Sequence, residues 1–396
     1  MNKRHAMLGV VRACATLLLV GSTIAVVADA QALTPIEQLG KAIFFDQNLS
    51  INSNQSCATC HGPAAGWTGP DSMINAHGAV YEGSIPGAFG DRKPPSSAYA
   101  TFAPILYVDK KGQWTGGNFW DGRATGWRLG NPAAEQALGP FLNPMEQALN
   151  SPADVVTRVC TSSYGGLFVE VWGPEACAPA NVGVAYESIG YSVAAYEASL
   201  EVNAFTAKFD QGKLTPQEQR GYGLFRGKGK CARCHTADGQ KPLFTDFTYD
   251  NLGLPKNPEN PFYTTHPDYL DEGLGGFLRA IGYGEDVYGP NIGKHKVPTL
   301  RNVDKWDGSL GPRVKAYGHN GYFKSLEGIV HFYNTRDVKP VCPGDYTEAE
   351  ALATSCWPAP EIAQNVNTAE LGNLGLTAAE EAAIVAFLKT LSDGYQ

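Results

Sequence analysis

Two short stretches of the sequence contain closely spaced cysteines and histidines that can bind metals or form covalent bonds. They are "CATCHGP" (57–63) and "CARCHTADG" (231–239), and each has two cysteines three positions apart followed at once by a histidine. A CxxCH pattern can be half of a zinc site, a redox dithiol, a disulfide or the covalent anchor of a c-type haem. The residues concerned are Cys57, Cys60, His61, Cys231, Cys234 and His235.

Covalent haem attachment explains every member of the pattern. A zinc ion shared by both stretches would leave the role of the histidines unexplained. A thioredoxin-like dithiol expects a βαβ setting, which the sequence does not show. In a c-type site the two thiols add to the haem vinyl groups, and the adjacent histidine binds the iron. The sequence therefore predicts two c-type haems, with His61 and His235 as the proximal iron ligands.

The first thirty residues are typical of a secretory signal. Residues 1–30 have a basic start, an apolar run and small residues before a predicted cut after Ala30. A retained membrane anchor is the alternative. No later stretch approaches the 18 apolar residues of a membrane span. We expect an exported protein in the periplasm, with the cell surface as the alternative location.

Charge and cysteine content support an exported, non-nucleic-acid-binding protein. The formal net charge is -8, which argues against nucleic acid and suits a basic protein partner. Four cysteines lie outside the signal and the two CxxCH stretches, and they fall into local pairs. In an exported protein we expect them to form disulfides, which pair Cys160 with Cys177 and Cys342 with Cys356.

A repeated motif must position the two chemical stretches. "LTPIEQLGKAIFF" (33–45) and "LTPQEQRGYGLFR" (214–226) share most of their residues. Each has threonine at the cap, proline at the first helical position and glutamate at the third, which predicts the start of a helix. Each helix leads to a CxxCH. We therefore predict two homologous domains, 31–210 and 211–396.

Apolar segments predict a closing helix in each domain, at 186–205 and at 376–391. Gly- and Pro-rich stretches such as 79–96 and 251–268 predict long loops, and strand signals are weak. The expected fold is mainly α: two cytochrome c-like haem domains with long irregular loops.

Four further motifs carry a family resemblance across nearly the whole mature chain. They are "FWDGRA" (119–124), "EQALGPFLNPMEQ" (135–147), "KVPTLRNV" (296–303) and "HNGYFKSLEGIVHFYN" (319–334). With the two CxxCH stretches, they make the chain resemble the bacterial di-haem cytochrome c peroxidases and the related MauG-type enzymes.

The resemblance implies roles for individual residues. His61 would hold the N-terminal haem, where peroxide reacts, and His235 the electron-transfer haem. Glu146 resembles the distal acid–base that moves a peroxide proton, and Gln136 resembles its companion. Trp120 resembles the tryptophan that passes electrons between the haems.

The resemblance also implies further metal ligands, two for the haem irons and one for calcium. His77 lies in the loop where peroxidases carry a removable sixth ligand of the N-terminal haem. No methionine follows residue 146, and Tyr333 stands where peroxidases place the methionine ligand of the C-terminal haem. His331 or an open position are the alternatives to Tyr333. The resemblance also implies an interdomain calcium, although Lys93 stands where many relatives have an asparagine ligand.

Three functions remain open from the sequence. The first is a peroxidase that reduces hydrogen peroxide with electrons relayed from a small donor cytochrome or cupredoxin through the C-terminal haem. The second is a MauG-like enzyme that oxidises side chains of a partner protein. The third is a non-catalytic electron carrier, which the pair Gln136 and Glu146 argues against. The resemblance also admits a homodimer.

Overall fold

Both Thr-Pro repeats begin helices as predicted. The helices are α1 (Pro35–Phe45) and α8 (Pro216–Arg226). At the third position of each helix, Glu37 or Glu218 accepts a hydrogen bond from the backbone N–H of the capping threonine, with N to Oε2 distances of 2.6 and 2.7 Å. These contacts satisfy a backbone donor at each helix start, and they confirm the predicted capping boxes.

The computed structural model describes residues 32–395. The predicted signal at 1–30 and its cleavage site lie outside the described residues. No helix within 32–395 combines the length and apolar character needed to cross a bilayer. Residues 33–396 group as one compact unit, so the predicted boundary at 210/211 stays a prediction.

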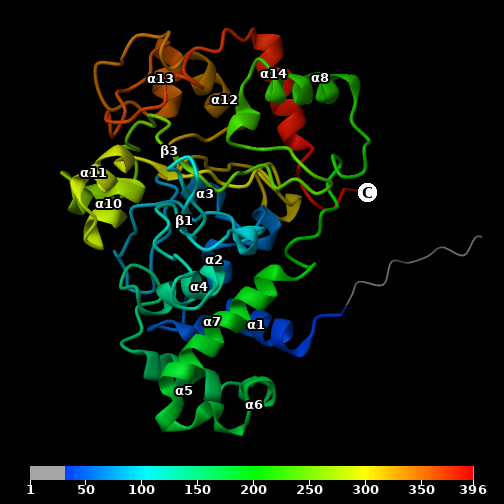
Figure 1. Ribbon diagram of the computed structural model, residues 1–396, viewed down its shortest axis with the longest axis vertical. Coiled ribbons are helices and arrows are strands. Elements are labelled where there is room, and N and C mark those ends of the chain that lie inside the picture. The colour runs from blue at the N-terminus through cyan, green and yellow to red at the C-terminus, as the bar shows by residue number, and fades with distance from the viewer. Residues whose placement is uncertain (1–31, 396) are drawn as a thin grey trace, which may run out of the picture. The chain divides into compact units, whose positions relative to one another are not determined.

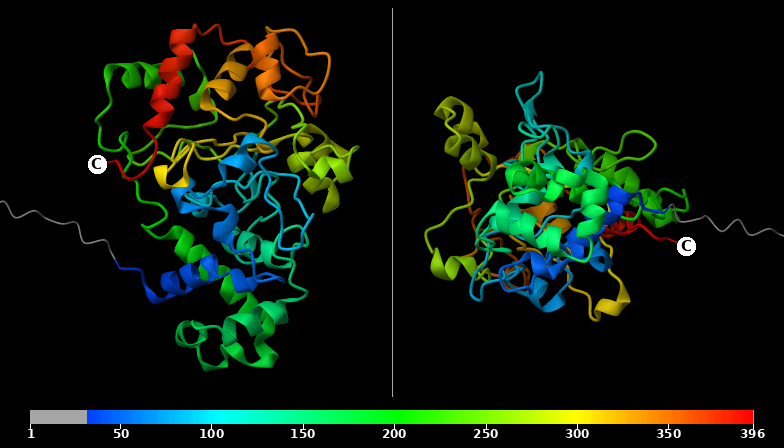
Figure 2. Two further views of the ribbon diagram at one scale, coloured as in Figure 1. Left: turned by 180° about the vertical axis from the view of Figure 1, so that it is seen from behind. Right: turned by 90° about the horizontal axis from the view of Figure 1, so that it is seen from below.

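Each repeat helix packs against a later helix of the same half of the chain. Helix α1 lies along α7 (Val182–Ala198), and α8 lies along α14 (Ala378–Lys389), as Figure 1 and the reverse view in Figure 2 show. A glycine stands at the same repeat position in both pairs. A Cβ on Gly40 would overlap the carbonyl oxygen of Ser192, and a Cβ on Gly221 would overlap that of Ala383. The repeat therefore encodes two close helix–helix crossings.

The remaining elements are short. The other helices are α2 (Cys57–Cys60), α3 (Ser72–Ala76), α4 (Pro132–Leu142), α5 (Pro152–Thr161), α6 (Gly165–Trp172), α9 (Phe262–Thr265), α10 (Gly273–Ala280), α11 (Glu285–Tyr288), α12 (Leu326–Thr335) and α13 (Glu348–Thr354). Two antiparallel pairs join β1 (Tyr107–Val108) to β2 (Trp114–Thr115) and β3 (Tyr249–Asp250) to β4 (His295–Lys296). The chain is helix-rich with small sheets, as predicted.

The predicted closing helices are present, with shorter bounds. Helix α7 ends at Ala198 rather than 205, because Ser199 adopts an extended conformation that stops the helix. Helix α14 begins after Thr377, whose side-chain oxygen accepts from the backbone N–H of Glu380.

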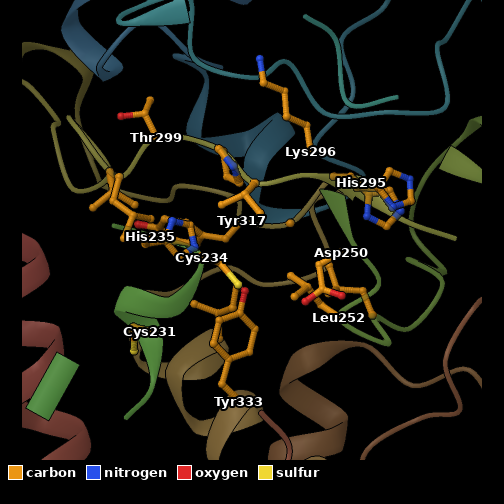
Figure 3. A pocket seen from close by; sticks show the side chains of 18 of the residues that line it. Cys231, Cys234, His235, Asp250, Leu252, His295, Lys296, Thr299, Tyr317 and Tyr333 are labelled. Atoms are coloured by element: carbon orange, nitrogen blue, oxygen red, sulfur yellow. The ribbon is translucent and has the colours of Figure 1, made fainter. Parts of the chain in front are cut away.

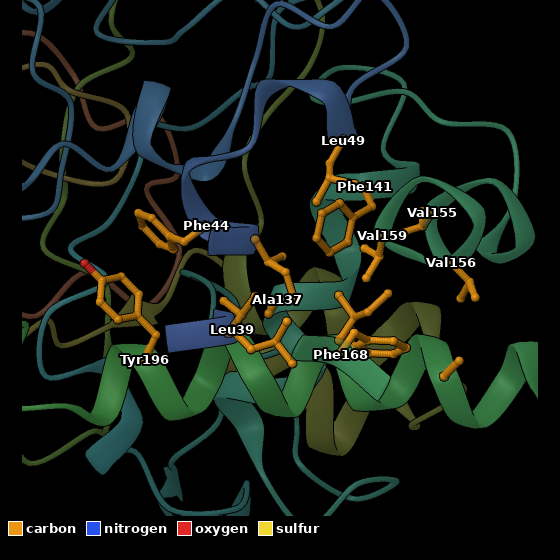
Figure 4. Packing of buried hydrophobic residues seen from close by; sticks show 14 of the residues in the cluster. Leu39, Phe44, Leu49, Ala137, Phe141, Val155, Val156, Val159, Phe168 and Tyr196 are labelled. Carbon is orange, nitrogen blue, oxygen red and sulfur yellow. The ribbon is translucent and has the colours of Figure 1, made fainter. Parts of the chain in front are cut away.

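Buried apolar residues form two large clusters. One draws on residues 39–202 and includes Leu39, Phe44, Phe141, Phe168 and Tyr196, shown in Figure 4. The other draws on residues 225–391. Each CxxCH helix or turn packs against the cluster of its own half, so each core supports one candidate chemical site.

Both predicted disulfides are present. Cys160 on α5 bonds to Cys177, and Cys342 bonds to Cys356 just after α13. They close local loops with sequence separations of 17 and 14 residues. The cysteines at 57, 60, 231 and 234 form no disulfide.

The glycine crossing gives a test of how the repeat holds the fold. We expect Gly221→Ala to destabilise the protein by about 1–3 kcal/mol, because the added methyl must displace the α14 backbone. Gly223→Ala on the exposed side of α8 is the control, since its Cβ would meet nothing and alanine favours helix by about 0.5–1 kcal/mol. Thermal unfolding followed by circular dichroism should show a lower midpoint for the first variant only. Equal midpoints would contradict the close crossing.

Candidate functional site

The first CxxCH borders a small buried cavity. Helix α2 carries both cysteines, and His61 follows as its cap. The Nδ1 of His61 donates to the carbonyl oxygen of Trp67 at 3.3 Å. This contact leaves Nε2 free to bind a metal. His61 lines a cavity of about 70 Å³ together with Trp120, Gln136 and Glu197.

The second CxxCH borders a larger cavity of about 210 Å³ (Figure 3). The Nδ1 of His235 donates to the carbonyl oxygen of Phe244 at 2.8 Å, so its Nε2 is also free to ligate. Apolar side chains make much of the lining, among them Leu254, Val330 and Leu388. Cys231 and Cys234 stand on the wall beside the histidine.

Burial sets the ionisation of these residues. It raises the pKa of the Cys57 and Cys231 thiols to about 12, so both stay protonated. It lowers the pKa of His61 to about 4, and it also lowers that of His235. Neutral imidazole is the form that binds a metal. A backbone carbonyl on the other ring nitrogen is the usual way in which such a ligand is oriented.

These features fit a c-type haem at each CxxCH. Each place has two unpaired thiols, a neutral oriented imidazole and an adjoining cavity. A zinc ion shared between the two stretches does not fit, because among residues 32–395 no metal-sized cluster of ligand atoms joins one stretch to the other.

Trp120 lies between the two cavities and lines both. Its ring is 8% exposed, and its Nε1 donates to the carbonyl oxygen of Lys93 at 2.9 Å. Its own carbonyl accepts from the backbone N–H of Lys296 at 2.8 Å, and Lys296 also lines both cavities. The structure therefore brings Trp120 to the position from which it can contact groups in either cavity.

The two predicted distal residues line different cavities, and Phe119 lines both of them. Gln136, on α4, lines the His61 cavity. Glu146 lines an adjoining, more open cavity of about 380 Å³ with Arg123, and Phe119 borders both spaces. Burial raises the pKa of Glu146, although Arg123 opposes the shift. The carboxyl group is thus biased toward its protonated, proton-donating form.

Glu197 is a candidate that the sequence reasoning missed. It lies on α7, is 3% exposed and lines the cavity with His61 and Gln136. Burial raises its pKa to about 8, with partial opposition from the Ser97 hydroxyl. The sequence signal that could have identified Glu197 is an acidic residue within a predicted helix whose other residues are mostly apolar or aromatic.

Tyr333 and His331 point to different surroundings. Tyr333, on α12, lines the larger cavity, and Figure 3 shows its hydroxyl directed toward Cys234. Burial raises the pKa of its phenol. His331 instead places Nδ1 3.1 Å from the carboxylate of Glu381 on α14, and it is not part of the cavity lining. The structure brings Tyr333, and not His331, to the second CxxCH.

His77 lies away from the cavity of His61. It follows α3 with its side chain 62% exposed, and its Nδ1 is 3.1 Å from Glu259 Oε1. The structure does not bring His77 together with His61, so the ligand role stays a prediction.

Lys93 places a nitrogen where the resemblance implies a calcium ligand. Its Nζ donates to Thr68 Oγ1 at 2.9 Å and to the Pro94 carbonyl oxygen at 2.8 Å. Burial lowers the pKa of Lys93 to about 7, so the group stays cationic in mildly acidic solution. Calcium therefore stays an untested prediction, and the nearby lysine is unfavourable to it.

Comparisons with known proteins agree with this arrangement. The family described as di-haem cytochrome c peroxidase matches residues 35–218. The chain is 35% identical over 373 residues to the methylamine utilization protein MauG of Paracoccus denitrificans (strain Pd 1222), covering 90% of this chain and 88% of that protein. It is 27% identical over 365 residues to the cytochrome-c peroxidase IdrP2 of Denitromonas iodatirespirans, covering 90% and 81%.

A solved structure is also similar. The diheme peroxidase BthA from Burkholderia thailandensis E264 matches with a TM-score of 0.73 and 29% identity. The match covers 91% of this chain and 87% of that chain. The similarity therefore extends over both halves of the described chain.

The raised pKa of Glu197 predicts a pH-dependent stability. The folded state holds a proton up to about pH 8, whereas an unfolded glutamate releases it near 4.5. Glu197 therefore stabilises the fold most below pH 4.5, and this contribution is lost as the pH rises through 8. Each pKa unit is worth about 1.4 kcal/mol, so the loss is on the order of 5 kcal/mol.

Glu197→Gln should remove most of this dependence. Thermal midpoints of wild type and variant are measured from pH 5 to pH 8.5. The midpoint of the wild type should fall relative to that of the variant as the pH rises, because only the wild type loses the contribution of Glu197. Glu187→Gln on the same helix is the control, because the Glu187 side chain is 39% exposed and forms an ion pair with Arg128. Parallel wild-type and Glu197→Gln curves would show that the carboxyl group does not titrate in this range.

Proposed function

We propose, for a chain that belongs to the di-haem cytochrome c peroxidase family, that it is an exported enzyme that reduces hydrogen peroxide with electrons from a donor protein. The observation that carries the proposal is the cavity at His61. Gln136 and Glu197 line it, Glu146 lines a cavity that shares Phe119 with it, and Trp120 lines both this cavity and the second one. An electron carrier has no need of proton-handling side chains at this place.

The two CxxCH stretches would hold the haems. The cysteine thiols would form the covalent bonds, and His61 and His235 would bind the irons through Nε2. A c-type haem bound at His61 would supply the redox-active iron at which peroxide is reduced. Tyr333, which lines the larger cavity, would contribute a second ligand there.

Glu146 and Gln136 would manage the protons of the reaction. Reduction of one hydrogen peroxide to two waters consumes two electrons and two protons. Because burial raises its pKa, Glu146 can donate a proton to the departing oxygen and regain it from water in the adjoining open cavity. The side-chain amide of Gln136 would orient peroxide by hydrogen bonding from the wall of the His61 cavity.

Trp120 would carry electrons between the two haem sites. Its ring is held by the hydrogen bond from Nε1 to Lys93 and by the backbone contact to Lys296. These contacts fix an aromatic ring in the walls of both cavities. We propose that electrons supplied by a small cytochrome or cupredoxin reach the His61 side past this ring.

The disulfides support a location outside the cytoplasm. Cys160–Cys177 and Cys342–Cys356 are bonds that persist in oxidising compartments. With the predicted signal at 1–30, they favour the periplasm.

Replacing Glu146 tests the function. We expect Glu146→Gln to lose roughly 100- to 10,000-fold in peroxide turnover, because a general acid–base contributes about that much. Steady-state peroxide consumption with a reduced donor cytochrome measures it. Mass spectrometry of the denatured chains should show two haem additions in both proteins, so the loss would be catalytic.

Glu170→Gln, on the exposed face of α6, is the matched control and should keep full turnover. Turnover near wild type in Glu146→Gln would remove Glu146 from the mechanism. A chain with one haem or none would overturn the di-haem assignment itself.

A second candidate function rests on Tyr333. An anionic phenolate ligand would favour the oxidised state of an iron, whereas a methionine thioether raises the reduction potential. The tyrosine in the larger cavity, with the 35% identity to MauG, favours an enzyme that oxidises side chains of a partner protein. The acidic chain would suit a basic partner surface.

Tyr333→Phe distinguishes a ligand from a packing residue. We expect the variant to keep its fold and both haems, while one iron changes spin state and its reduction potential rises. Electron paramagnetic resonance and a redox titration measure these changes. Tyr322→Phe is the control, because this buried tyrosine belongs to the same apolar cluster and donates to the Tyr346 carbonyl outside the cavity. Identical spectra and potentials for wild type and Tyr333→Phe would assign the ring to packing.

A further inference from the structure

Three lysines line the larger cavity together with Trp120, where the first half of the chain meets the second. Lys93 is 8% exposed and Lys315 is 4% exposed, and Lys296 is half-buried. Each side chain ends on oxygen atoms of the protein itself, and several of these contacts cross from one half of the chain to the other. We call Lys93, Lys296 and Lys315 the junction lysines.

Lys93 is fixed through both its side chain and its backbone. Its Nζ donates to Thr68 Oγ1 at 2.9 Å and to the Pro94 carbonyl oxygen at 2.8 Å. Its backbone N–H donates to the carbonyl oxygen of His319 at 2.8 Å, and its own carbonyl accepts from Trp120 Nε1 at 2.9 Å. The ammonium group therefore lies at a fixed position between the loop after the first CxxCH and the second half of the chain.

Lys296 reaches from the second half of the chain into the first. It lies on β4, and its Nζ donates to the Gly117 carbonyl oxygen and, at 2.9 Å, to Asn118 Oδ1. Figure 3 shows its side-chain nitrogen directed away from Cys231 and Cys234. Lys296 thus binds the segment that directly precedes Trp120.

Lys315 joins the halves through three backbone carbonyl groups. Its Nζ donates to the carbonyl oxygens of Ala65 at 2.8 Å, Asn302 at 3.1 Å and Lys305 at 3.0 Å. Burial lowers the pKa of Lys315, but three acceptors require three N–H donors, and only the ammonium form has three. The contacts therefore favour a cation that links Ala65 of the first half to the second half.

The oxygens around Trp120 are thus already committed to protein cations. All acceptors of the junction lysines are carbonyl, amide or hydroxyl oxygens. Carbonyl and amide oxygens, with carboxylates and water, are what a calcium ion takes in a shell of about six to eight ligands. The carboxylate next to Trp120 is committed too, because Asp121 Oδ2 accepts from Arg92 Nη1 at 2.7 Å and from Arg123 Nη1 at 2.8 Å.

The charge of the junction lysines also opposes a metal cation. Burial lowers the pKa of Lys93 and of Lys296 to about 7, so both side chains are positively charged at pH 6. Like charges repel more strongly in a buried site than in water, because the surrounding dielectric constant is lower. A divalent cation placed among these ammonium groups would lose its oxygen ligands and meet this repulsion.

We propose that the junction lysines take the place of the interdomain calcium that the family resemblance implies, so the two halves are held together without a metal ion. Lys93 supplies a fixed positive charge at the position where many relatives have an asparagine ligand. Lys296 and Lys315 bind the oxygens on either side of it. The stability of the protein and the surroundings of its haems should therefore not depend on the supply of calcium.

The first test uses wild-type protein that carries both haems, dialysed against EGTA at pH 6 and divided into two portions. One portion receives millimolar calcium chloride. After desalting, inductively coupled plasma mass spectrometry should find no calcium above the buffer blank in either portion. The thermal midpoint and the electron paramagnetic resonance spectrum should be the same with EGTA as with calcium.

The second test converts the site. Lys93→Asn removes the ammonium group, releases two oxygens and adds an amide oxygen, so this variant should take up one calcium for every two irons. Its thermal midpoint should be higher in calcium than in EGTA, because an ion that binds only the folded state stabilises it. Lys93→Met adds no ligand and should show a lower midpoint than the wild type in both buffers. Lys110→Asn, at an exposed lysine, is the control and should behave as the wild type does.

Two outcomes would overturn the proposal. One is a wild type that retains one calcium for every two irons and loses thermal stability in EGTA. The other is a Lys93→Asn variant whose midpoint and calcium content do not respond to calcium, which would show that Lys93 does not occupy a cation site. If that variant fails to fold, the calcium content and midpoints of the wild type still decide. These readouts do not depend on peroxide turnover, so this proposal and the proposed function can fail separately.

Discussion

The structure depends on two helix crossings that are close enough to exclude a side chain. In each half of the chain, a glycine of the Thr-Pro repeat lies against a backbone carbonyl of a later helix, Ser192 for Gly40 and Ala383 for Gly221. The crossing fixes the helix that precedes each CxxCH and the apolar cluster behind it. Each candidate haem place therefore rests on a rigid pair of helices rather than on the loops that make up much of its wall.

The two halves are joined by buried polar contacts as well as by apolar packing. Arg301, which is 1% exposed, donates from Nη1 to both oxygens of Asp210 at 2.8 and 2.7 Å, and from Nε to the Pro242 carbonyl. Asp393 accepts from the Tyr99 hydroxyl at 2.6 Å and from the backbone N–H of Thr206. Removing one member of such a buried pair leaves an uncompensated charge, so these contacts favour one relative placement of their segments.

The buried carboxyl groups differ in their ionisation, because their neighbours differ. Around His61 burial raises the pKa of Glu146 and Glu197, which keeps protons available. Around His295 the nearby Arg92 reverses this effect and keeps Asp271 ionised. The glutamates near His61 therefore favour the protonated form, whereas Asp271 beside Arg92 favours the ionised form. The difference arises from the neighbours and not from the depth of burial.

Features that depend on local spacing could be predicted from the sequence alone. The capping boxes, the CxxCH stretches, the local disulfide pairs and the absence of methionine after residue 146 could all be recognised, because each involves residues close together in the chain or a simple count. The family motifs added Trp120, Gln136, Glu146 and Tyr333 as candidates.

Which of these residues share a cavity became clear from the three-dimensional structure. It placed Tyr333 beside Cys234 and turned His331 toward Glu381, it left His77 at the surface, and it added Glu197. It also brought Asp271, His295, His319 and Glu361 together from four separate segments. Burial and long-range proximity set the pKa and the ligand geometry of a side chain, and neither quantity is encoded in the spacing of residues along one segment.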